Sequence, residues 1–162
     1  MNTPLGWFTA FHTFLSLLAI GFGLWAVRDL MRGRMRSSAI TVFLATAILT
    51  SVTGFFFPYH GPTPAIAVGV IALIVLGWTL YARRHANRPG FGGAQFPIGM
   101  VVSEYFLVFV LVAQIFAKAP ALAALPPDLQ KKFFGATQLV VLAIFVVVAI
   151  RTTRSFRLRA TA

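Results

Sequence analysis

The chain alternates between long apolar stretches and short polar connections. Five apolar stretches cover residues 5–27, 39–57, 65–82, 98–117 and 133–150. A helix that crosses the hydrocarbon core of a bilayer, roughly 30 Å thick, needs about 20 predominantly apolar residues. The pattern therefore predicts an all-α polytopic membrane protein, a bundle of five transmembrane helices that forms a single domain over residues 1–162.

The connections contain residues that end or start helices. Residues 58–64 hold three prolines and one glycine, which predicts a compact turn in which Pro58 ends the second helix and Pro64 starts the third. Residues 83–97 hold five prolines and glycines and are expected to be irregular. Asp128 is expected near the start of the fifth helix.

The charge distribution predicts how the chain is threaded. The chain has 14 lysines and arginines against three acids, a formal net charge of +11. The arginines follow the first, third and fifth stretches, whereas the lysines lie in the opposite connections. Since basic residues mark cytoplasmic loops, the N-terminus is predicted outside and the C-terminus in the cytoplasm. The tail arginines predicted to face anionic lipid headgroups are Arg151, Arg154, Arg157 and Arg159. The expected partner is thus the bilayer rather than nucleic acid.

Catalytic chemistry finds little support in the residues. The chain has no cysteine, which excludes disulfides, thiolate metal sites and thiol nucleophiles. Its acids, Asp29, Glu104 and Asp128, fall at different levels, and no metalloprotease or phosphate-loop motif is present. We therefore predict no catalytic residue and no cofactor, and the pattern leans against an enzyme.

Polar side chains inside the predicted helices are the candidates for function, because such residues face other helices or a cavity. His12 and Ser16 share a face of the first helix, and Thr50 and Thr53 share a face of the second. These positions fall mostly in the outer half of the bundle. The candidate intramembrane polar cluster is His12, Ser16, Thr50, Thr53, Gln114 and Gln138. Hydrogen bonds between helices would explain the same residues.

Two of the three histidines are candidate metal or haem ligands. His60 falls in the outer turn, on the membrane side where the helix that carries His12 begins. Two histidines on different elements can bind a haem. A packing role for His12 is the alternative, since a single imidazole on an apolar helix is not a binding motif.

Glu104 is the one acid inside a predicted span, about six residues past its cytoplasmic start. A charge at a helix centre costs roughly 2.5–3.5 kcal/mol on insertion scales. Two interpretations remain: a structural pair with Arg83, Arg84 or another helix, or a contact for a proton or a substrate.

Residues 50–65, which read TSVTGFFFPYHGPTPA, resemble segments of small uncharacterised bacterial multi-pass inner-membrane proteins. The resemblance covers roughly the first three predicted helices. It implies a bacterial inner (cytoplasmic) membrane and brings no activity, ligand or site residue.

The sequence favours a non-enzymatic accessory, scaffold or assembly component of a membrane complex. This interpretation rests on the few charges inside the membrane and on small residues such as Ala65 and Gly69, which let another backbone approach. The alternatives are a membrane protein that binds a small ligand or cofactor (haem, quinone or lipid) and a proton-coupled transporter that uses Glu104. A membrane-protein partner or a homo-oligomer fits the first interpretation.

Overall fold

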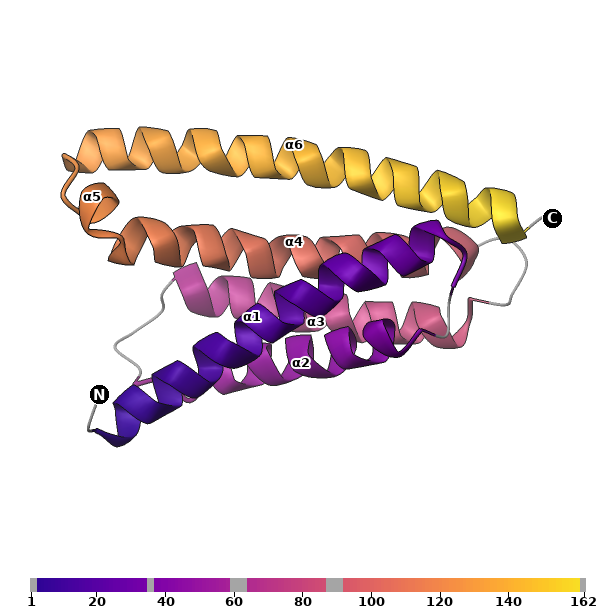
Figure 1. Ribbon diagram of the computed structural model, residues 1–162, viewed down its shortest axis with the longest axis horizontal. Helices are drawn as coiled ribbons and strands as arrows, with labels where there is room; N and C mark the ends of the chain where they lie inside the picture. The colour runs from indigo at the N-terminus through magenta and orange to yellow at the C-terminus, as the bar shows by residue number, and fades with distance from the viewer. Residues whose placement is uncertain (1–2, 35–36, 59–63, 87–91, 161–162) are drawn as a thin grey trace.

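The computed structural model describes residues 3–34, 37–58, 64–86 and 92–160, and the regular structure in these ranges is helical. Five long helices run along the long axis of the molecule, and a short helix joins the last two (Figure 1). The elements are α1 Pro4–Met31, α2 Ser38–Gly54, α3 Pro64–Arg84, α4 Gly92–Lys118, α5 Pro120–Ala123 and α6 Pro127–Ala160. The prediction of an all-α protein is confirmed.

Local capping explains where the first helices begin and end. The Thr3 hydroxyl accepts a hydrogen bond from the Gly6 amide at 3.2 Å, and Pro4 occupies the first position of α1. Gly33 follows α1 with a φ of 75°, a conformation that glycine adopts without steric cost. The Ser37 hydroxyl then caps α2 by accepting from the Ala39 amide at 3.1 Å.

The start of α4 and the end of α2 differ from the expectation. The prediction that residues up to Pro97 are irregular was wrong for its last part, because α4 begins at Gly92 and contains Pro97. Phe96, Pro97 and Met100 are fully buried, so packing holds this segment helical, and a proline in the second turn removes only one early hydrogen bond. The second helix ends at Gly54, before Pro58, whereas α3 begins at Pro64 as predicted.

The last helix is much longer than its apolar stretch. It runs from Pro127 to Ala160, against the expected 133–150, because helical hydrogen bonding continues into polar flanks at both ends. Asp128 lies in its first turn, as predicted, where a carboxylate interacts favourably with the helix dipole.

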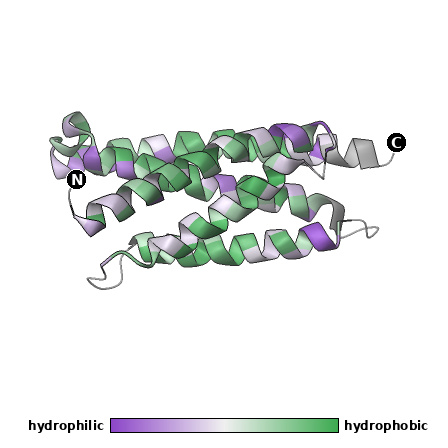
Figure 2. Cartoon of the chain, turned by 60° about the horizontal axis from the view of Figure 1, so that its bottom comes forward, coloured by the Kyte–Doolittle hydropathy of each residue, from purple (hydrophilic) through white to green (hydrophobic). Residues whose placement is uncertain are grey.

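Four helical segments are long and apolar enough to cross a membrane. They are Pro4–Met31, Ala65–Arg84, Ala94–Lys118 and Pro127–Ser155. At 17 residues α2 is shorter but equally apolar. Hydrophobic residues run along the helices, and hydrophilic residues lie mostly toward the ends (Figure 2). Large side chains such as Trp25, Ile74 and Leu139 are more than half exposed. The chain thus has the surface of a multi-pass membrane protein.

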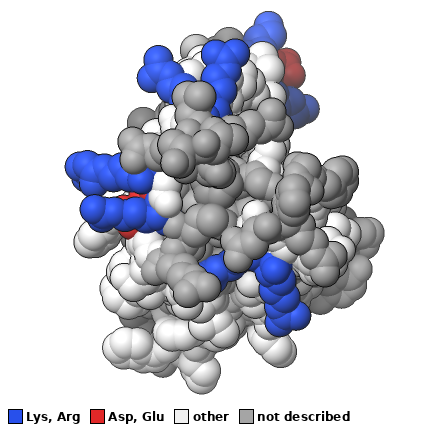
Figure 3. All heavy atoms as spheres, turned by 90° about the vertical axis from the view of Figure 1, so that its right-hand side faces the viewer, with Lys and Arg blue, Asp and Glu red and all other residues white. Residues whose placement is uncertain are grey.

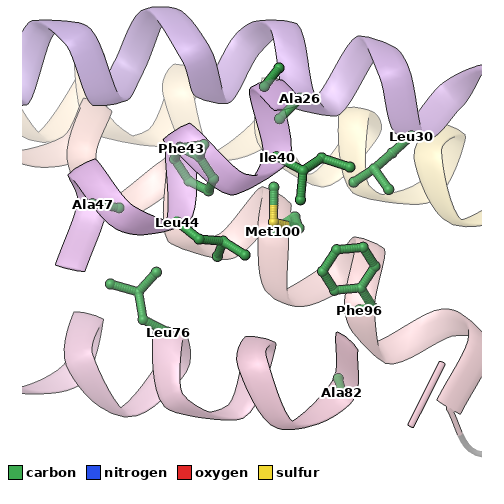
Figure 4. Close-up of a cluster of buried hydrophobic side chains, with 11 residues drawn as sticks. Ala26, Leu30, Ile40, Phe43, Leu44, Ala47, Leu76, Ala82, Phe96 and Met100 are labelled. Carbon is green, nitrogen blue, oxygen red and sulfur yellow. The ribbon is translucent and has the colours of Figure 1, made fainter. Parts of the chain in front are cut away.

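The buried core lies toward one end of the bundle. We call this end of the bundle the basic end. Helices α1, α3 and α6 finish there, and α2 and α4 begin there. The core joins side chains from α1, α2, α3 and α4 (Figure 4). Its members are Ala26, Leu30, Ala39, Ile40, Phe43, Leu44, Ala47, Leu76, Ala82, Phe96 and Met100. By contrast, α6 packs mainly on α4 and has only two buried residues among its described side chains, Gln138 and Thr152.

Arginine side chains gather at the basic end. Figure 3 views the molecule from this end and shows basic side chains at several places across it, whereas the lysines of α4 and α6 lie at the opposite end. Arg28, Arg34 and Arg84 lie in or next to the last turns of α1 and α3, and Arg151 and Arg154 lie in the last ten residues of α6. The charge asymmetry of the sequence is therefore an asymmetry between the two ends of the bundle.

Candidate functional site

His12 and Thr53 join α1 to α2 in the half of the bundle away from the basic end. The His12 Nδ1 atom lies 2.9 Å from the Thr53 hydroxyl oxygen, and the imidazole is partly buried. The ring of Phe57 meets the imidazole edge-on, with ring centres 5.1 Å apart. Two neighbouring elements therefore fix both the position and the tilt of this histidine.

The hydrogen bonds around Thr53 favour the tautomer of His12 that carries its proton on Nδ1. The Thr53 hydroxyl lies 2.7 Å from the Leu49 carbonyl and 3.2 Å from the Thr50 carbonyl, both of which can only accept. With its single proton given to one of these carbonyls, the Thr53 oxygen accepts from the Nδ1–H of His12, whereas donation to Nδ1 would leave both carbonyl contacts without a proton. In the neutral ring Nε2 is then left with a lone pair, the form that binds a metal or accepts a hydrogen bond.

The other members of the predicted polar cluster divide between two places. The Ser16 hydroxyl donates to the His12 carbonyl at 2.7 Å, and Thr50 is buried on α2, one turn before Thr53. Gln138 lies on α6, where its Nε2 donates to the Phe109 carbonyl of α4 at 3.0 Å. Gln114 is exposed on α4. The structure thus brings His12 and Thr53 together, with Ser16 and Thr50 one turn away on the same two helices, and places the two glutamines elsewhere.

The remaining predicted site residues are only partly described. His60 lies outside the described residues, so the structure does not place it relative to His12. Arg151 and Arg154 are exposed at the basic end. Arg157 and Arg159 lie on α6 as well, but their side chains fall outside the described part.

Glu104 is fully buried on α4, against α1 and α2. A β-carbon at Gly23 of α1 would collide with the Glu104 carboxyl and would come within 2.8 Å of the Phe43 ring of α2. Gly23 therefore leaves the space that the carboxyl fills. Sequence reasoning singled out Glu104 but not its contact with Gly23. Both residues lie in the half of their helix nearer the basic end, which was the available signal.

The Glu104 carboxyl has no polar partner among the described residues. Neither oxygen forms a hydrogen bond, and the neighbouring Ser103 hydroxyl, also buried, forms none. Arg83, one of the two expected partners, instead donates to the Thr41 hydroxyl of α2 at 3.0 Å. Arg84, the other, is exposed. The neighbours that the structure gives this carboxyl are thus Gly23 and the Phe43 ring, neither of which can hydrogen-bond to it through a side chain.

Asp29 is the other buried acid, and its surroundings are the opposite. The Ser37 hydroxyl donates to one carboxylate oxygen, and the Arg34 guanidinium lies 3.8 Å from the other. The same residues line a shallow, open pocket of about 330 Å³ beside the rings of Phe22 and Trp25. This cluster was not predicted from the sequence, although Asp29 is the only acid within the first group of arginines.

Within the described ranges, no group of three or more histidine, cysteine, aspartate or glutamate side chains could hold a metal ion.

Comparison with protein-family models, with curated proteins and with solved structures gives no match.

Proposed function

We propose that the chain crosses the bacterial inner membrane five times, with its N-terminus outside and its C-terminus in the cytoplasm. The gathering of arginines at the basic end supports this topology, because cytoplasmic ends carry the basic residues. At 1.5 Å per residue the 17 residues of α2 span about 25 Å, near the lower limit for a crossing helix. The basic end then faces anionic lipid headgroups, and the resemblance of residues 50–65 supports the bacterial membrane.

We further propose that the protein is a non-enzymatic accessory, scaffold or assembly component of a membrane complex. The observation that carries this proposal is the core at the basic end (Figure 4). Side chains such as Phe43, Phe96 and Met100, all fully buried, fill the space between α1, α2, α3 and α4. A substrate path along the bundle would have to displace them, so the geometry favours a closed protein that acts through its outer surface.

The structure changes which surfaces are available to a partner. Gly69, expected to face another protein, instead faces Phe55 of the same chain, whose ring would lie 3.2 Å from an added β-carbon. A β-carbon at Gly21, Gly77 or Gly135 would meet nothing within 4 Å. These three glycines lie on different helices, α1, α3 and α6, and each allows a neighbouring helix to approach closely.

The test is the size and composition of the complex isolated from native membranes with a mild detergent. Wild type is expected to migrate with a partner at fixed stoichiometry, as a hetero-complex or a homo-oligomer. Each of Gly21→Leu, Gly77→Leu and Gly135→Leu adds bulk to one outer face, and we expect one of them to abolish the complex. The other two variants then serve as matched controls. A wild-type protein that is monomeric and free of partners at native expression would refute the proposal.

A second candidate function, binding of a small ligand or cofactor, is favoured by one observation. The Thr53 hydroxyl orients His12 through Nδ1 and favours the tautomer with a lone pair on Nε2, as in histidines that bind a metal or a haem. Whether His60 would be the second ligand depends on residues outside the described part. The test is the visible spectrum and the solvent-extracted contents of protein purified from membranes that contain haem and quinone. His12→Ala should lose a bound molecule that His85→Ala retains. A colourless wild type with no co-extracted quinone or specific lipid would exclude this function.

A further inference from the structure

The two buried acids among the described residues, Asp29 and Glu104, differ in their polar partners. Asp29 has a hydroxyl donor and a guanidinium, the partners that a buried carboxylate requires. Glu104 is completely buried and has neither. An ionised carboxylate without partners is very costly in such surroundings, whereas a neutral acid costs far less. Binding of a proton is therefore the simplest way to keep this side chain where the structure has it.

We infer that Glu104 is a proton-binding site at the contact between α1 and α4, and that release of its proton loosens this contact. The neutral carboxyl fits the space left by Gly23, with the Phe43 ring on its other side. On release, the proton passes to water and a negative charge remains on Glu104. Water can reach that charge only where α1 and α4 separate. This inference needs the membrane-embedded bundle but is independent of the proposed accessory role.

No described charged group is placed to substitute for the proton. The helices around Glu104 carry several titratable or charged residues, whereas α2 has none. They are His12, Arg28 and Asp29 on α1, Tyr81, Arg83, Arg84 and His85 at or just after the end of α3, Tyr105 and Lys118 on α4, and Asp128, Lys131, Lys132, Arg151, Arg154, Arg157 and Arg159 on α6.

The closest of these groups along the chain are engaged or turned away. On α1, Asp29 lies six residues beyond Gly23, about 9 Å along the axis, and is held by Ser37 and Arg34. The ring of Tyr105 packs against Phe106, Phe109 and Phe145. Arg83 bonds to Thr41. An ionised Glu104 would therefore need a rearrangement before any of them could compensate its charge.

The first test needs no substitution, because Glu104 is the only glutamate of the chain. Protein labelled with ¹³C at the glutamate carboxyl gives one carboxyl signal, which solid-state NMR can follow in a lipid bilayer as the pH changes. We expect the signal of a neutral acid at about pH 6, where an ordinary glutamate is ionised. A carboxylate signal at that pH would overturn the inference.

The second test asks whether the proton controls the α1–α4 contact. Amide hydrogen exchange around Gly23 is compared between wild type and Glu104→Gln over a range of alkaline pH. The ratio of the two exchange rates cancels the intrinsic effect of pH on exchange. We expect the exchange rate of wild type, divided by that of Glu104→Gln, to rise several-fold as Glu104 loses its proton. A constant ratio would refute the coupling, even if the NMR signal titrates. Should Glu104→Gln fail to fold, the wild-type α6 segment around Leu139 serves as the internal reference.

Neither outcome depends on a partner protein. A monomeric wild type would remove the accessory role and leave the proton site intact. Conversely, a carboxylate at Glu104 would leave the complex, and the variants that disrupt it, unaffected. The two proposals therefore fail separately.

Discussion

At the scale of single residues, the chain uses glycine to make room for one particular side chain. Gly21 and Gly23 lie on the same helix, two residues apart. A β-carbon at Gly21 would meet nothing within 4 Å, whereas one at Gly23 would collide with the Glu104 carboxyl. The two positions therefore separate the helix propensity of glycine from its role in packing.

We predict opposite effects for the two glycine-to-alanine substitutions. Gly21→Ala should stabilise the protein by up to about 1 kcal/mol, because alanine is the better helix former. Gly23→Ala should destabilise it by about 1–3 kcal/mol through overpacking against Glu104. Unfolding in mixed micelles of increasing SDS content gives both free energies. Equal effects at the two positions would contradict the close contact.

A double variant identifies the group responsible. If the Glu104 carboxyl is what an alanine at 23 meets, Gly23→Ala combined with Glu104→Ala should be more stable than the sum of the single effects predicts. The rescue is expected to be partial, because the Phe43 ring also lies within 2.8 Å of the added β-carbon. If the two single effects on the free energy of unfolding add exactly, an alanine at 23 does not meet the Glu104 carboxyl.

At the scale of helices, aromatic side chains of α4 and α6 pack against one another where the two helices meet. Phe134 packs edge-on against Phe109 and Phe116, with ring centres 6.1 and 5.6 Å apart. Its neighbour Phe133 is 53% exposed. In a bilayer both rings are surrounded by apolar groups, so only specific packing distinguishes them.

The adjacent phenylalanines provide a matched pair. Phe134→Ala should weaken the attachment of α6 by about 1–3 kcal/mol, the sum of two aromatic contacts at roughly 0.5–1.5 kcal/mol each. Phe133→Ala should change stability by much less. Limited proteolysis in mild detergent at the connection between α4 and α6 reports the attachment. If Phe133→Ala is cleaved as fast as Phe134→Ala, the α4–α6 packing described above is incorrect.

The sequence predicted the helices far better than it predicted their contacts. Hydropathy located the apolar part of each long helix, but it could not show that α6 continues to Ala160, because polar flanks remain helical without an apolar signal. Nor could it show that Pro97 lies inside α4, since tertiary burial there overrides the local cost of proline. Periodicity gave the shared faces of His12 and Ser16 and of Thr50 and Thr53. It could not pair Gly23 with Glu104, which requires the crossing of α1 and α4.

At the scale of the whole molecule, the number of crossings determines where the arginines lie. The five crossings that we propose would place the ends of α1, α3 and α6 on one side of the membrane, together with their arginines. If α2 did not cross, the ends of α3 and α6 would lie on the side opposite to the end of α1. The arginine groups would then be divided between the two faces, against the positive-inside rule.

Whether the 17-residue helix α2 crosses the membrane therefore decides the topology. Because the chain has no cysteine, single introduced cysteines can test this directly. We predict that cysteines at Pro58 and Ala124 react with a membrane-impermeant maleimide added outside intact spheroplasts. Cysteines at Ala86 and Arg154 should react only after the membrane is opened. If α2 does not cross and the N-terminus is outside, all four results invert, because every later helix changes direction. With α2 spanning about 25 Å, a small local thinning of the bilayer suffices for the crossing, whereas the inverted arrangement exposes Arg83, Arg84 and the tail arginines on the outer face.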